Sequence, residues 1–250
     1  MTNPTIDPLV IIELTNLKAS GKLKELARHP GLTMKPEWMA ELVENKDWYV
    51  RQTLALNLAI VNYPEIIEIL STDEDPEVRE ALATNQVIAN FPEIAKTLAS
   101  NRFANVVCSL ARNPAIANAS DVIKKLGKDK RSPVREALAT NPALTEFPKL
   151  IAKLSTDPDL DVLLALSQNP AITSNPALVE KLATSKEFWV RISLAKNPTI
   201  ANFPETMRRL ASDENRYVRA TLASNPAIPT STANTNSWQT TQPATAMPTL

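Results

Sequence analysis

Hydrophobic and polar positions recur along this chain with a fixed period of 28 residues. The string Val-Arg-x-x-Leu-Ala-x-Asn-Pro carries the pattern most clearly, and it returns without insertion or deletion. Equal spacing over such a length indicates repeating structural units that stack on one another in a single geometry. The valine that opens the string, or its direct equivalent, is found at Val50, Val78, Val106, Val134, Val162, Val190 and Val218.

Each unit is expected to contain two short helices. The first helix is exemplified by residues 76–83, where apolar or small residues recur at helical spacing, Pro76 suits the first helical position and Asp75 can cap the N-terminus. The second helix opens at a repeated proline such as Pro92 and carries a conspicuous leucine, here Leu98. The pattern therefore predicts about fifteen short helices and no sheet.

The repeat register runs from about Pro8 to Ile228. It predicts an all-α fold, a right-handed α-solenoid of about eight two-helix repeats. We expect a single repeat domain over residues 1–228, with an N-terminal capping helix at about residues 7–18. Residues 229–250 are rich in Thr, Ser, Asn, Ala and Pro without apolar periodicity, and they are predicted to form a disordered tail.

Composition narrows the choice of partners and compartment. The chain is 44% apolar and holds 27 basic and 27 acidic side chains, so it has no overall attraction to nucleic acid or membrane. Cys108 is the only cysteine, which excludes an internal disulfide and fits a reducing compartment. The N-terminus lacks the features of a secretory signal, and no apolar run approaches the roughly 20 residues that span a bilayer. We expect a cytoplasmic protein without a membrane partner.

Catalytic and metal chemistry have little support in the sequence. His29 is the only histidine, and it occupies the repeat position that asparagine fills elsewhere. One histidine and one cysteine cannot form the usual zinc sites, and three scattered glycines do not make a phosphate-binding loop. We therefore predict no catalytic, cofactor or metal site and a protein that is not an enzyme.

These repeats resemble a known family. The Val-Arg-x-x-Leu-Ala-x-Asn-Pro string, the second helix opened by proline and an acidic turn such as residues 155–159 are similar to the leucine-rich repeat variant family and, more distantly, to HEAT-type repeats. The family's repeat is usually shorter, and segments such as residues 143–146 carry the extra length here. Some members are associated with an iron–sulfur cluster, which needs several thiolates that Cys108 alone cannot supply.

Two polar series follow the period. An asparagine amide at a helix end would satisfy backbone groups that otherwise lack partners, and a ladder of ligand-binding amides is the alternative. The asparagines are Asn57, Asn85, Asn113, Asn141, Asn169, Asn197 and Asn225.

The second series pairs arginines on the first helices with aspartates in the turns before them. We expect an Asp–Arg ladder between neighbouring units, and a phosphate-binding stripe is the alternative. The arginines are Arg51, Arg79, Arg135, Arg191 and Arg219, and the aspartates are Asp73, Asp129, Asp157 and Asp213.

Two surfaces vary from unit to unit, and such variation can encode recognition. On the first helices, the face expected to be exposed carries large apolar side chains in the last units, which favours a protein partner there. That predicted site consists of Leu164, Trp189, Ile192, Lys196 and Tyr217.

On the second helices, basic side chains form a stripe that offers a possible site for sugar-phosphate. Its members are Lys96, Lys124, Lys125, Lys128, Lys153, Lys181, Arg208 and Arg209. The leading hypothesis from the sequence is a non-enzymatic scaffold that binds a protein partner along its repeat surface. The alternative is a nucleic-acid-binding solenoid that uses the basic stripe.

Overall fold

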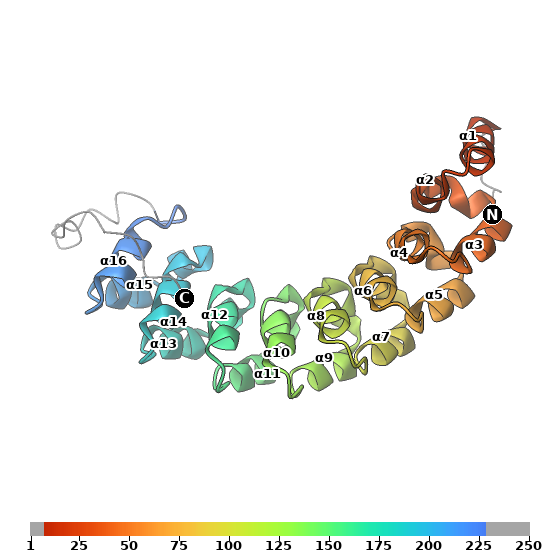
Figure 1. Cartoon of the computed structure of the whole chain (residues 1–250). Coiled ribbons are helices and arrows are strands. Elements are labelled where there is room, and N and C mark those ends of the chain that lie inside the picture. The colour runs from red at the N-terminus through yellow and green to blue at the C-terminus, as the bar shows by residue number, and fades with distance from the viewer. Residues whose placement is uncertain (1–7, 229–250) are drawn as a thin grey trace, which may run out of the picture. The chain divides into compact units, whose positions relative to one another are not determined.

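The computed structural model describes residues 8–228, in which helices are joined by short turns and connections. Within this range there are sixteen α-helices, seven 3-10 helices and no strand. Consecutive helices pack against each other in a repeat-like arrangement, as the pattern predicted (Figure 1). The tail at residues 229–250 lies outside the described residues. The chain divides into two compact units, Met1–Lys128 and Asp129–Leu250.

The first unit begins with α1, which covers the position of the expected capping helix. Its elements are α1 (Pro8–Ala19), α2 (Leu23–Arg28), η1 (Pro30–Met34), α3 (Pro36–Val43), α4 (Trp48–Ala55), η2 (Leu58–Asn62), α5 (Pro64–Ser71), α6 (Pro76–Thr84), η3 (Gln86–Asn90), α7 (Pro92–Leu98), α8 (Ala104–Arg112), η4 (Pro114–Asn118) and α9 (Ser120–Leu126).

The second unit continues the same alternation. Its elements are α10 (Ser132–Ala139), η5 (Pro142–Glu146), α11 (Pro148–Leu154), α12 (Leu160–Gln168), η6 (Pro170–Ser174), α13 (Pro176–Ala183), α14 (Phe188–Lys196), η7 (Pro198–Asn202), α15 (Pro204–Ala211) and α16 (Arg216–Ala223).

The 3-10 helices are the element that the sequence pattern did not predict. Each follows an asparagine, or His29, whose backbone is extended, and a proline often occupies its first position. Proline disfavours the α conformation in the residue before it, so the first helix ends there. The apolar residues beyond it form one short 3-10 turn, the usual length for this helix type. The extra length of these repeats is therefore ordered helix rather than open loop.

The first helices, which carry the Val-Arg string, pack in sequence within each unit. In the first unit α2 contacts α4, α4 contacts α6 and α6 contacts α8. In the second unit α10 contacts α12, α12 contacts α14 and α14 contacts α16. The repeated valine and leucine of the string are buried in every one of these helices from α4 onward, and they form the core. The side chains that remain exposed on the first helices form the faces considered below.

Helix starts differ in detail from expectation. Asp47 and Asp159 accept hydrogen bonds from the backbone N–H two residues ahead and cap α4 and α12. Asp75 stands at the same position before α6, but its side chain makes no capping bond. Instead its Oδ2 accepts a hydrogen bond of 2.9 Å from Arg51. Pro76 occupies the first turn of that helix, as predicted.

Candidate partner-binding surface

The asparagine amides join neighbouring repeats through the backbone. In the first unit, the Nδ2 of Asn85 donates to the carbonyl oxygens of Ala55 at 2.7 Å and Asn57 at 3.3 Å, and its Oδ1 accepts from the N–H of Val87 at 3.0 Å. Five other asparagines make the equivalent bonds to the repeat before them, and all five are buried: Asn57, Asn113, Asn169, Asn197 and Asn225. Asn141 is fully buried, and its Oδ1 accepts from the N–H of Ala143 at 2.8 Å. An amide so used is not available to a ligand.

His29 performs part of the same task. Its Nδ1 accepts a hydrogen bond of 3.0 Å from the N–H of Gly31, which is the bond that an asparagine Oδ1 makes in the other repeats. Its Nε2 lies 3.5 Å from a carboxylate oxygen of Glu13 on α1. The one histidine therefore caps η1 and sits beside an acid.

Three of the arginines are held in clamps that are buried or half-buried. Arg51, Arg135 and Arg191 each direct Nε and Nη2 to both carboxylate oxygens of the aspartate that precedes the next first helix. For Arg135 and Asp157 these distances are 2.7 and 2.9 Å, and Nη1 also donates to the carbonyl of Asp129 at 2.8 Å. The bonds to Asp157 raise the pKa of Arg135, and the same bonds lower the pKa of Asp157. These three guanidiniums are occupied by protein groups rather than open to phosphate.

Two arginines of the series have no carboxylate clamp. Arg79 is buried and donates to the carbonyls of Asp73 and Glu74, while its Nε has no hydrogen-bond partner and its guanidinium lies 5.3 Å from the ring of Phe103. Asn101 occupies the repeat position where an aspartate clamps three other arginines, and its side chain offers no carboxylate. Arg219 donates to the carbonyls of Asp213 and Glu214. The Asp–Arg ladder is therefore complete at three of the five arginines.

The predicted partner site on the second unit is only partly exposed. Ile192 was expected on the exposed face, but it is buried, with 2% of its surface accessible, so it cannot contact a partner. Leu164, Trp189 and Tyr217 are half-buried and Lys196 is exposed. Trp189 packs against Phe188 with ring centroids 4.7 Å apart. Both α12 and α16 pack against α14, so this helix is covered on more than one face.

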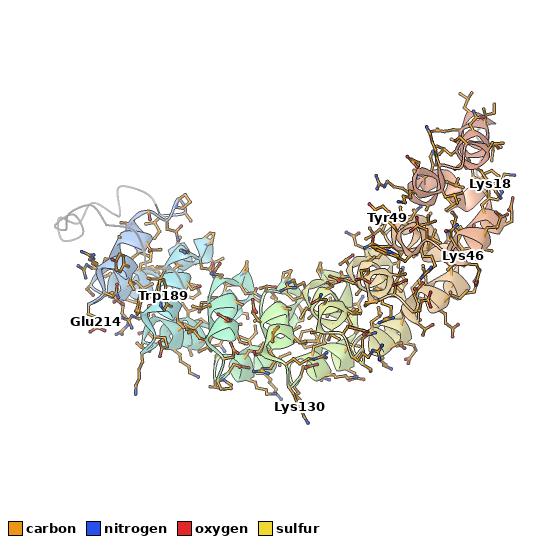
Figure 2. All side chains as sticks on the ribbon, viewed as in Figure 1. Lys18, Lys46, Tyr49, Lys130, Trp189 and Glu214 are labelled. Atoms are coloured by element: carbon orange, nitrogen blue, oxygen red, sulfur yellow. The ribbon has the colours of Figure 1, made fainter. Side chains whose placement is uncertain are left out.

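The most exposed apolar side chains on and just beyond the first helices lie in the first unit, where no partner site was predicted. Trp48 and Tyr49 on α4 are 41% and 40% exposed, and Leu56 and Leu58 just beyond it are 53% and 58% exposed. We call these four residues the α4 patch. Figure 2 labels Tyr49, which occupies the same position of the repeat as Trp189. A comparison of equivalent repeat positions along the whole chain could therefore have predicted the α4 patch from the sequence.

The basic residues of the second helices are all exposed, as a nucleic-acid site would require. Several of them are already matched by acids or hydroxyl groups. Lys96 pairs with Glu93 at 2.7 Å, and Arg209 pairs with Glu180 at 2.6 Å. Lys124 pairs with Asp121, Arg208 with Glu205, and Lys125 and Lys181 donate to the hydroxyls of Ser100 and Ser155. The neighbouring acids reduce the attraction of these basic side chains for phosphate.

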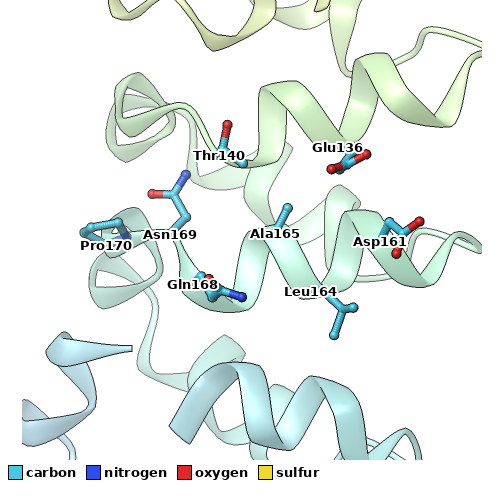
Figure 3. A pocket seen from close by; sticks show the side chains of 8 residues that line it. All are labelled: Glu136, Thr140, Asp161, Leu164, Ala165, Gln168, Asn169 and Pro170. Carbon is cyan, nitrogen blue, oxygen red and sulfur yellow. The ribbon is translucent and has the colours of Figure 1, made fainter. Parts of the chain in front are cut away.

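A groove lies between α10 and α12 on the exposed face of the first helices. It encloses about 450 Å³. Figure 3 shows Glu136 and Asp161 toward one end of it and Thr140, Asn169 and Pro170 toward the other. The groove is also lined by Leu164, Ala165 and Gln168. Leu164 borders it but points away from α10, and the other residues of the predicted partner site do not line it.

Within residues 8–228 no three histidine, cysteine or acidic side chains gather as a metal site would require. No helix of this part of the chain combines the length and apolar character needed to cross a membrane. No protein-family model and no curated protein sequence matches this chain. The resemblance to leucine-rich repeat variants therefore rests on the repeat motif of the sequence.

Proposed function

We propose that this chain is a non-enzymatic scaffold that binds a protein partner through the exposed faces of its first helices. The α4 patch carries the proposal. Its four side chains, two aromatic and two aliphatic, are each at least 40% exposed. A group of large apolar side chains kept in water is unfavourable unless a partner covers it, and such groups mark interaction sites.

The finer architecture belongs to the same proposal. We infer a right-handed α-solenoid of about eight repeats, akin to the leucine-rich repeat variants. The support is the constant spacing of the first helices, which begin at Trp48, Pro76 and Ala104 in the first unit and at Leu160, Phe188 and Arg216 in the second. Repeat surfaces of this kind suit binding along their length rather than in one deep cavity.

Partner capture by tagged full-length protein tests the function. The triple change Trp48→Ala, Tyr49→Ala and Leu56→Ser should weaken the complex by about thirtyfold or more, because truncating one aromatic anchor can cost about 2 kcal/mol. Affinity is measured with the captured partner by calorimetry, after nuclease treatment of the lysate. The variant Trp189→Ala with Tyr217→Ala tests the half-buried aromatics of the second unit in the same assay.

A matched control removes exposed apolar side chains from other positions. Ile12 on α1 and Ile69 on α5 are 55% and 40% exposed, so Ile12→Ser with Ile69→Ser should leave capture unchanged. Normal capture by a folded α4-patch variant would contradict the assignment of this surface. Loss of all capture after nuclease treatment would instead favour the nucleic-acid alternative.

A further inference from the structure

We propose that the groove between α10 and α12 seats a lysine or arginine side chain from an extended segment of the protein partner. This inference rests on the proposed function, because it names the chemistry of one contact with that partner. The groove lies between two first helices of the second unit, and Glu136 and Asp161 line it toward one end (Figure 3).

Another pair of repeats shows that side chains at these two positions can approach each other. In the first unit the equivalent positions hold Lys24 on α2 and Tyr49 on α4, and the Nζ of Lys24 lies 4.3 Å from the centre of the Tyr49 ring. The same ammonium group lies 3.8 Å from Asp47. Side chains at these two repeat positions can therefore meet between neighbouring first helices. Between α10 and α12 both positions hold carboxylates.

Nothing in the described residues neutralises this pair. No basic side chain forms an ion pair with Glu136 or Asp161 within residues 8–228. Glu80 lies in the first unit and occupies the same position of the repeat as Glu136. It accepts a hydrogen bond of 3.0 Å from Ser109. Ala165 replaces that serine here, so Glu136 has no hydroxyl in this place. A cation bound in a groove that two carboxylates line is attracted by both of them.

The remaining lining fits the rest of such a side chain. Ala165 offers apolar surface to the aliphatic stem, while the carboxylates accept hydrogen bonds from the charged end. Thr140 is exposed, and Gln168 is held by a 2.7 Å hydrogen bond to Ser193, so its amide oxygen is fixed in orientation. A volume of about 450 Å³ accommodates one long side chain with its flanking backbone.

Nuclear magnetic resonance of the full-length, 15N-labelled protein provides the test. The probes are acetyl-Ala-Arg-Ala-amide, acetyl-Ala-Lys-Ala-amide and acetyl-Ala-citrulline-Ala-amide, of which the last keeps the shape of arginine without its charge. The two cationic peptides should shift the amide signals of Thr140, Ala165 and Gln168, and the citrulline peptide should not. Glu136→Gln with Asp161→Asn should weaken binding of the arginine peptide by about tenfold or more.

The control removes the same charge elsewhere in this unit. Glu146 and Glu187 are exposed and lie outside the groove, so Glu146→Gln with Glu187→Gln should retain the shifts. Equal shifts from the citrulline peptide, or unchanged binding by the folded Glu136→Gln, Asp161→Asn variant, would overturn the inference. If that variant still captures the protein partner with full affinity, the groove is not part of the interface, and the proposed scaffold function is left intact.

Discussion

At the scale of single residues, the asparagine side chain does most to join one repeat to the next. Asn169 is 2% exposed and makes three hydrogen bonds, two to carbonyls of the preceding repeat and one from the backbone ahead. Only a short amide has both an acceptor and two donors within this reach. A buried backbone group that loses such a partner keeps its full cost of desolvation.

Replacing Asn169 by alanine should therefore lower the free energy of unfolding by about 1–3 kcal/mol. Urea unfolding followed by circular dichroism measures the change. Asn202 is exposed at the end of η7, and Asn202→Ala serves as the matched control, with an expected change within about 0.5 kcal/mol. Equal stability of the two variants would mean that the ladder contributes nothing to cohesion between repeats.

At the scale of elements, three arginine clamps tie α4, α10 and α14 each to the turn before the next first helix. Arg135 on α10 holds the turn that precedes α12 through Asp157, and it also holds the carbonyl of Asp129 before its own helix. One side chain thus fixes two turns at once. The clamp depends on the ionised form of the aspartate, and its stabilisation therefore depends on pH.

The pKa of Asp157 is lowered in the folded protein, mainly by its hydrogen bonds to Arg135. The stabilisation is then fully present above the pKa of an unfolded aspartate, about 3.9, and is lost as pH falls through the lower folded value. Asp157→Asn should be less stable than the wild type at neutral pH by about 1–3 kcal/mol.

The difference between the two proteins should shrink progressively below about pH 4. Urea titrations at a series of pH values test this, and the exposed Asp121 provides the control substitution Asp121→Asn, for which we expect little change. A stability difference that stays constant down to about pH 2 would show that ionisation of Asp157 is not what stabilises the clamp.

At the scale of the whole molecule, charge is balanced both in total and locally. The chain holds 27 basic and 27 acidic side chains, and several of the exposed basic residues on the second helices are paired with neighbouring acids. A partner rich in phosphate would have to displace these acids. The proposed recognition of a protein partner through the α4 patch would not require displacing these acids.

We therefore expect no binding of a fluorescent mixed-sequence duplex or single strand at about 50 mM salt, where phosphate contacts are strongest. Fluorescence anisotropy with the full-length protein is the measurement. Binding that weakens steeply with salt, and less steeply after Lys124→Ala, Lys125→Ala and Lys153→Ala together, would instead establish the basic stripe as a nucleic-acid site.

The sequence by itself determined the repeat, the helical class and the positions of most helix starts. These follow from local rules: the spacing of apolar residues, proline in the first turn, and the asparagine that ends each first helix. The sequence also placed arginine and aspartate in matching registers. The 3-10 helices escaped prediction because a single five-residue turn is too short to show a periodicity of its own.

Only the tertiary structure decided which side chains remain in water. Ile192 and Leu56 are both large and apolar and both lie on the variable face of a first helix, yet Ile192 is buried and Leu56 is exposed. Exposure depends on how closely the neighbouring helices and their side chains cover a position, and no local pattern encodes that. The same holds for Glu136 and Asp161. They are separated in the sequence, but they line one groove because α12 packs against α10.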